Sequence, residues 1–190
     1  MENGRIELIA IYDGRFQPFH IGHLAFIERI HAETGLPVAV LVIRSTVSNE
    51  AVGYSSIADE HHRPEKNPLS VWERVSLINQ AIAHEGYDFV SGVLAIPRPD
   101  LYWSIAQAFY PSERVICLSG KDDYERQKEV FWASLGEQTV VIDTDGLPTI
   151  SSTAVKQMMR NGEDWSPLIP AGARNYFAEI NGYERLQAAT

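Results

Sequence analysis

An uninterrupted apolar run at residues 37–43 restricts the fold of this chain more than any other feature. Its sequence, PVAVLVI, has no polar side chain and is rich in β-branched residues, which is typical of a strand covered on both faces. Further strand-like runs at residues 6–12, 88–96, 114–119 and 139–142 alternate with stretches of helical periodicity. We therefore expect an α/β protein with a single doubly wound, Rossmann-like parallel sheet and helices on both faces.

Length and charge narrow the possibilities further. A chain of 190 residues fits one domain with its own core, so we expect residues 1–190 to form a single domain. The net charge of −9 argues against a nucleic-acid partner and implies that any anion site is a local cluster. The N-terminus does not resemble a signal peptide, and no apolar run is long enough to span a membrane, so we expect a cytoplasmic protein with no membrane partner.

The stretch GRFQPFHIGH at residues 14–23 joins the first expected strand to a helix. Gly14 shapes the loop, and His20 and His23 fall at the start of the helix. Free backbone N–H groups and the helix dipole favour an anion there. Gly22 keeps a side chain out of the space between the two histidines. The arrangement suits a polyphosphate whose charge must be stabilised during a reaction.

A second polar stretch, ISSTAVK at residues 150–156, opens another helix. Three hydroxyl residues at a helix N-terminus offer caps and phosphate ligands, and Lys156 lies about one turn further on. An ordinary capped helix would show the same residues. Arg15 in the first stretch adds a guanidinium suited to phosphate, and together the two stretches favour one shared anion site.

Ser70 and Glu73 predict where a third helix begins. A serine followed three residues later by glutamate forms a capping-box pattern. The residues that follow are apolar at helical spacing, which predicts a helix with one buried face.

The pattern His-x-Gly-His after a first strand resembles the nucleotidylyltransferase superfamily. The longer pattern of residues 14–23 looks most like the nicotinamide-mononucleotide adenylyltransferases of the archaeal type. Residues 150–156 resemble the superfamily's Ile-Ser-Ser-Thr-x-x-Arg, with Lys156 where arginine is usual. Lysine keeps the charge but loses the two-pronged geometry of a guanidinium. The resemblance covers nearly the whole chain and implies one nucleotidylyltransferase domain.

This resemblance implies transfer of AMP from ATP to nicotinamide mononucleotide, which yields NAD and pyrophosphate. It assigns the catalytic work to His20, His23, Arg15 and Lys156. Mg²⁺ is the expected cofactor, held on the β and γ phosphates by substrate and water, so we name no protein ligand for it. The other residues expected to bind the nucleotide are Gly14, Phe16, Gly22, Ser151, Ser152 and Thr153.

For the phosphorylated acceptor, the resemblance points to three further segments. Lys66 and Asn67 stand where the family has an arginine and an Asx residue before proline. Trp103 falls near the family tryptophan that stacks on the nicotinamide ring, although a core tryptophan is an equal expectation. Gly120 and Lys121 fall where the family has a glycine-centred loop near the substrate.

The sequence leaves the acceptor, the base and the oligomeric state open; a homo-oligomer is possible. A second hypothesis is a cytidylyl- or adenylyltransferase acting on another phosphorylated or phosphonate small molecule. Lysine at 66 and 156 and a long polar segment at residues 45–65 support this hypothesis. A third hypothesis is a nucleotide-binding regulator without catalytic turnover. The presence of both histidines argues against it. His61 and His62 in the polar segment are more typical of solvated side chains than of metal ligands.

Overall fold

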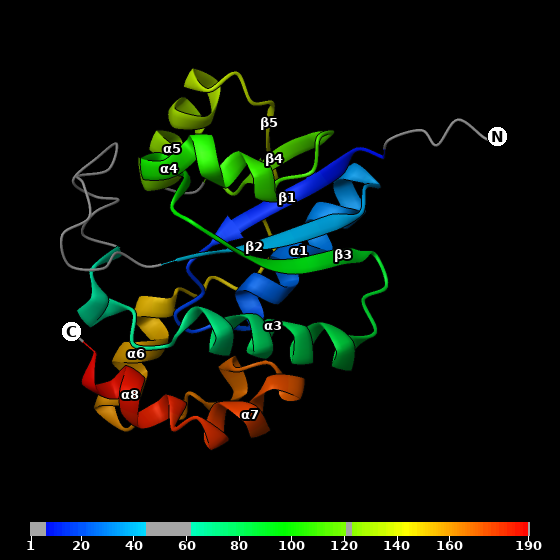
Figure 1. Ribbon diagram of the computed structural model, residues 1–190. Helices are drawn as coiled ribbons and strands as arrows, with labels where there is room; N and C mark the ends of the chain where they lie inside the picture. The colour runs from blue at the N-terminus through cyan, green and yellow to red at the C-terminus, as the bar shows by residue number, and fades with distance from the viewer. Residues whose placement is uncertain (1–6, 45–61, 121–122, 190) are drawn as a thin grey trace.

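A computed structural model describes residues 7–44, 62–120 and 123–189 of the chain. Five parallel strands form one sheet in the order β3-β2-β1-β4-β5 (Figure 1). The strands are β1 (Ile9–Gly14), β2 (Val38–Ile43), β3 (Val90–Ile96), β4 (Arg114–Leu118) and β5 (Thr139–Val141). The predicted parallel α/β sheet is confirmed. Lys121, His61 and most of the long polar segment lie outside the described residues.

Helices cover both faces of this sheet. The α-helices are α1 (Ile21–Thr34), α3 (Val71–Glu85), α4 (Pro99–Ala106), α5 (Asp123–Ser134), α6 (Ser152–Asn161), α7 (Arg174–Glu179) and α8 (Gly182–Ala188). Short 3-10 turns are η1 (Pro64–Lys66), η2 (Gln107–Phe109), η3 (Ser166–Leu168) and η4 (Ala171–Ala173). Within the described part of the chain, no helix is both long and apolar enough to cross a membrane.

Alternate side chains of the strands enter two separate cores. Val40 and the other β2 side chains on the same face of the sheet pack with α1, α3 and the C-terminal helices. Leu41, on the opposite face, packs with α4 and α5. Every residue of β2 is buried, which explains why its sequence has no polar side chain. The sheet therefore has the same two-sided burial that the apolar runs predict.

The start of α3 is where the capping box predicts it. The Ser70 Oγ accepts a hydrogen bond from the Glu73 N–H at 3.2 Å, and the Ser70 N–H donates to the Glu73 carboxylate at 2.6 Å. The C-terminal part of the chain forms two separate helices, and the second, α8, begins at Gly182. Asn181 adopts a left-handed conformation with φ of 52°, which separates α7 from α8.

Candidate functional site

Two histidines stand together where α1 begins, just after β1. His20 is the N-cap residue of α1, and its ring stacks on that of His23 with 3.6 Å between centroids. The His20 N–H donates to the His23 Nδ1 at 3.2 Å, which fixes the second ring against the first. A Cβ on Gly22 would lie 3.1 Å from two atoms of the His20 ring and 3.3 Å from the Pro148 carbonyl oxygen. Glycine at this position therefore leaves the histidine pair its space.

The loop between β1 and α1 is held from distant parts of the chain. The Gln17 amide donates to the Leu69 carbonyl oxygen at 2.6 Å and accepts from the Leu69 N–H at 3.2 Å. The Ser152 hydroxyl donates to the Pro18 carbonyl oxygen at 3.0 Å. The Phe16 side chain is buried, and its backbone is in the left-handed region, with φ of 53°. A non-glycine residue adopts this conformation only where its surroundings hold it.

Arg74 supports the same loop from inside α3. Its guanidinium donates to the carbonyl oxygens of Arg15 at 2.5 Å and Ile43 at 2.9 Å. Burial, with the neighbouring charge of Arg15, lowers the pKa of Arg74 to about 10, so the side chain remains a cation at neutral pH. The ends of β1 and β2 are thus tied to one buried cation.

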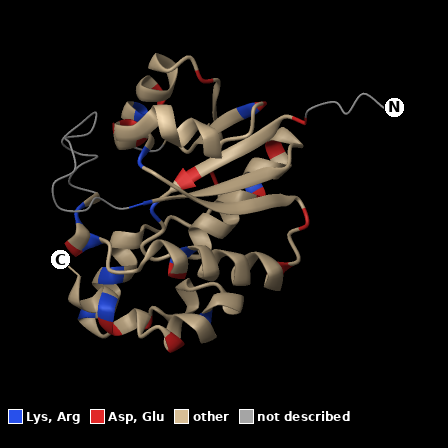
Figure 2. Ribbon diagram, viewed as in Figure 1, with Lys and Arg blue, Asp and Glu red and all other residues tan. Residues whose placement is uncertain are grey.

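A cluster of basic side chains surrounds this loop. The Lys156 ammonium donates to the Lys66 carbonyl oxygen at 3.3 Å, and the Arg15 Nη1 donates to the Asn67 Oδ1 at 3.4 Å. Burial, followed by the charges of Arg15, Arg160 and Lys66, lowers the pKa of Lys156 to about 8. Figure 2 shows Lys and Arg residues gathered where η1, α6 and α8 lie, although the chain is acidic overall. Cations held this close together favour an anion between them.

The hydroxyl residues at the start of α6 divide into two groups. The Ser151 Oγ accepts from the Ala154 N–H at 3.1 Å and caps the helix, and the Ser152 hydroxyl is bonded to the loop after β1 as described. Thr153 is exposed. The structure therefore brings the start of α6 and the start of α1 together, as the two sequence patterns predict.

Trp103 lies elsewhere. Its ring packs edge-on against Tyr110 and Trp132, with centroids 5.4 and 5.5 Å away, and the Arg114 guanidinium lies 5.6 Å above it. Arg114 opens β4, so Trp103 sits toward the amino end of the strands, whereas His23 follows the carboxyl end of β1. The structure does not bring Trp103 to the histidines. Its ring is partly buried and packs on Trp132, which lines the pocket described below, so its expected stacking on the nicotinamide ring stays a prediction.

Gly120 lies two residues after the end of β4 and is left-handed, with φ of 59°. A Cβ there would lie 2.7 Å from the Val141 side chain, so the turn requires glycine. Its neighbour Lys121 is outside the described residues, and its expected role stays a prediction.

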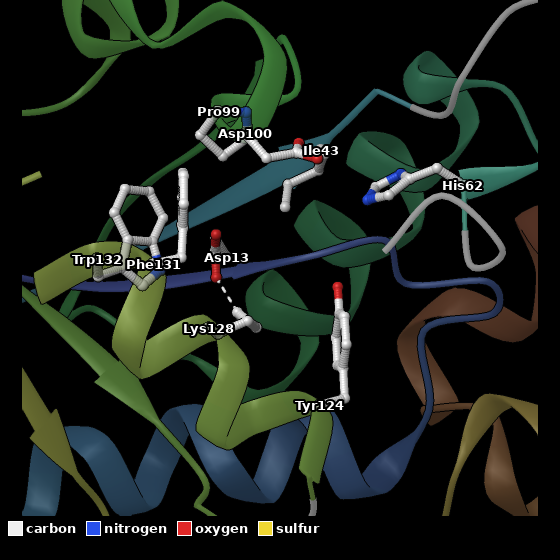
Figure 3. Close-up of a pocket in the computed structure, with 9 residues that line it drawn as sticks. All are labelled: Asp13, Ile43, His62, Pro99, Asp100, Tyr124, Lys128, Phe131 and Trp132. Atoms are coloured by element: carbon white, nitrogen blue, oxygen red, sulfur yellow. Dashed lines mark hydrogen bonds and ion pairs between the residues drawn. The ribbon is translucent and has the colours of Figure 1, made fainter. Parts of the chain in front are cut away.

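A pocket beside the basic cluster contains residues that the sequence interpretation missed (Figure 3). Asp13, at the end of β1, accepts from the Lys128 ammonium of α5 at 2.8 Å, and Glu125 lies 3.6 Å from the same ammonium. Burial works against the charge of Lys128, but Asp13 and Glu125 outweigh it and hold the lysine pKa well above its ordinary value. The pocket is lined by Asp13, Ile43, His62, Pro99, Asp100, Tyr124, Lys128, Phe131 and Trp132.

Two signals point to this pocket. Asp13 is a charged residue at the end of an otherwise apolar strand run, which in the sequence is the one sign of a polar site there. Burial raises the pKa of Tyr124, and the charge of Arg15 acts in the opposite direction. Tyr124 lines this pocket and lies within electrostatic range of Arg15, a residue of the basic cluster.

A parallel sheet with a histidine pair, a basic cluster and a pocket at the carboxyl ends of its strands has the design of a nucleotide-binding α/β enzyme. The sequence profile of the cytidylyltransferase-like family matches residues 11–158 of this chain. The chain belongs to that family. The match includes the histidine pair, the pocket and the start of α6.

Individual relatives agree with this assignment. Nicotinamide-nucleotide adenylyltransferases from Halobacterium salinarum and Methanosphaerula palustris are each 29% identical to this chain. The alignments cover 93% of this chain and 89% of the first relative, and 94% and 95% for the second. A crystal structure from Vibrio parahaemolyticus, provisionally described as a nicotinate-nucleotide adenylyltransferase, has the same fold: its TM-score is 0.57 at 15% identity, covering 93% of this chain and 95% of that one.

Proposed function

We propose that this chain is an adenylyltransferase that transfers AMP from ATP to nicotinamide mononucleotide, yielding NAD and pyrophosphate. One observation carries the proposal: the stacked pair of His20 and His23 and the cations Arg15 and Lys156 gather around the loop that follows β1. The names of the archaeal relatives, which align over most of their length, support the choice of acceptor.

The reaction requires positioning more than covalent chemistry. An oxygen of the acceptor phosphate attacks the α-phosphorus of ATP in line; the new P–O bond forms as the bond to the β-phosphate oxygen breaks, and pyrophosphate leaves with that electron pair. His20 and His23 stabilise the charge that develops on the α-phosphate. Arg15, Lys66 and Lys156 hold phosphate oxygens of ATP and the acceptor.

We further propose that Mg²⁺ accompanies the nucleotide. Within residues 7–44, 62–120 and 123–189, no group of three or more His, Cys, Asp or Glu side chains is arranged to hold a metal ion. The cations described above suit the phosphates themselves, and Mg²⁺ commonly binds through phosphate oxygens and water. When bound, the ion neutralises the leaving pyrophosphate.

The pocket beside Tyr124 is the proposed acceptor site. Its lining includes the aromatic side chains of Tyr124, Phe131 and Trp132, which suit a flat ring. We place the reaction in the cytoplasm, with small-molecule partners and neither nucleic acid nor membrane, in a monomer or a homo-oligomer that light scattering would distinguish.

Pyrophosphate release tests the proposal. ATP and CTP are each combined with nicotinamide mononucleotide and with a panel of other phosphorylated and phosphonate acceptors. We expect turnover with ATP and nicotinamide mononucleotide, and NAD as the product by mass spectrometry. Faster turnover with CTP, or with another acceptor, would contradict this proposal. It would favour the second hypothesis from the sequence, a different nucleotidylyltransferase.

A further inference from the structure

The last helix of the chain contacts two segments that both take part in the candidate site. α8 lies next to α6 and to the start of α3 (Figure 1), and hydrogen bonds join it to each of them. Toward α6, the Tyr183 hydroxyl and the Gln187 amide both donate to the Met159 carbonyl oxygen, at 3.4 and 3.2 Å. Toward α3, the contacts come from Arg185. The C-terminal helix therefore joins segments that are far apart in the sequence.

The Arg185 guanidinium binds the start of α3. Its two terminal nitrogens donate to the two carboxylate oxygens of Glu73, at 2.6 and 3.0 Å, and one of them also donates to the Pro68 carbonyl oxygen at 2.6 Å. A two-pronged contact of this kind fixes direction as well as distance. The hydrogen bond from Arg185 is the main cause that lowers the pKa of Glu73. These contacts are made to protein groups, so Arg185 is not among the cations assigned to phosphate.

The segment that Arg185 holds is the one that supports the loop after β1. Leu69 follows Pro68 in the chain, and its N–H and carbonyl groups are the two partners of the Gln17 side chain, at 3.2 and 2.6 Å. Gln17 is 2% exposed, so losing these bonds would leave buried polar groups unpaired. His20 follows three residues later in the same loop. A continuous series of hydrogen bonds and short chain segments thus runs from α8 to the histidine pair.

We infer that Arg185 is a positioning residue for nucleotidyl transfer, acting through Leu69 and Gln17 on the loop that carries His20. The inference rests on the proposed function. Without the guanidinium, the start of α3 loses its contacts to α8 and can shift, and the loop shifts with it. Because a displacement of about 1 Å at a reacting centre can cost about a hundredfold in rate, a small shift is enough to slow the reaction.

The first test is kcat at saturating ATP and nicotinamide mononucleotide. Arg185→Gln should lower kcat at least about fivefold, because the histidines must be placed accurately to stabilise the reacting phosphate. Arg185→Lys keeps a charge beside Glu73 but not the two-pronged contact, and should recover part of the loss. Glu137→Gln is the matched control. It breaks another two-pronged ion pair, with Arg114 at 2.6 and 2.7 Å where β4 begins, and should leave kcat unchanged.

A double-mutant cycle distinguishes positioning from a general loss of stability. Gln17→Leu keeps the side-chain volume and removes the hydrogen bonds to Leu69. If Arg185 acts through Gln17, Arg185→Gln should lower kcat little further once Gln17→Leu is present, since residues that act through a shared partner are not additive. Thermal unfolding shows which variants are folded at the assay temperature, and Arg185→Lys takes the place of Arg185→Gln in the cycle if the latter unfolds.

Amide hydrogen exchange supplies a readout that does not require turnover. Peptides covering residues 14–23 and 67–74 should exchange faster in Arg185→Gln than in the wild-type protein, and no faster in Glu137→Gln. Unchanged exchange of these peptides in a folded variant of Arg185, unchanged kcat, or additive losses in the cycle would each overturn the inference and leave the adenylyltransferase activity standing.

The proposed function fails by a different result. Turnover with another acceptor in place of nicotinamide mononucleotide would overturn the proposed acceptor alone, because the same variants can then be compared with that acceptor. A wild-type protein without turnover on any nucleotide and acceptor would overturn the proposed function, and the positioning role with it.

Discussion

Under the proposed function, the lowered pKa of Lys156 predicts that the use of ATP depends on pH in a particular direction. Burial, with Arg15, Arg160 and Lys66 nearby, brings this pKa to about 8 in the free protein. Below that pH the ammonium is charged and attracts phosphate; above it the side chain becomes neutral and the attraction is lost. Because kcat/KM reports the free enzyme, kcat/KM for ATP should fall as pH rises through about 8.

The magnitude follows from the titration of one group. With a pKa of about 8, the charged fraction falls from roughly 0.9 at pH 7 to roughly 0.1 at pH 9, so kcat/KM should drop by up to about tenfold over that interval. Lys156→Arg keeps the charge throughout, because a guanidinium is not deprotonated in this range. That variant should be active and should lose the alkaline decline.

The assay is pyrophosphate release at limiting ATP from pH 7 to 9.5, with Mg²⁺ and acceptor in excess. This range keeps ATP in one ionic form, so that the protein alone titrates. Lys66→Arg is the matched control: it replaces another lysine of the same cluster and should keep the decline. An equally steep decline in Lys156→Arg would refute the assignment, and a Lys156→Ala enzyme with unchanged kinetics would remove the residue from the site.

Three further substitutions test other parts of the site. His23→Ala should lower turnover by about two orders of magnitude or more, the loss typical of one preorganised charge-stabilising group, and near-full turnover with chemistry rate-limiting would exclude that role. Gly22→Ala should lower turnover without weakening the fold much, because its Cβ would lie 3.1 Å from the His20 ring; unchanged single-turnover rates would contradict this. Trp103→Ala should reduce the free energy of unfolding by roughly 2–3 kcal/mol through lost aromatic packing. If titration instead shows weaker binding of nicotinamide mononucleotide with unchanged stability, Trp103 belongs to the acceptor site.

The sequence alone predicts the order of the strands and helices and the loop that carries the two histidines of the candidate site. The apolar run of β2 predicts two-sided burial, and Ser70 with Glu73 predicts where α3 begins, because both patterns depend on neighbours a few residues apart. His20, Gly22 and His23 likewise share one loop and helix start. Such local patterns need no tertiary structure to be interpreted.

What supports and completes that site was decided by contacts across the chain. Gln17 is bonded to a residue 52 positions away, and Asp13 is paired with Lys128 at a separation of 115. No periodicity links such residues, since their proximity depends on which strands become neighbours in the sheet. Trp103 shows the same limit: the resemblance puts it near the family tryptophan that stacks on nicotinamide, but only the folded structure identifies its neighbours as Trp132 and Arg114. Sequence patterns report local conformation and burial, whereas the direction in which a side chain faces depends on the tertiary fold.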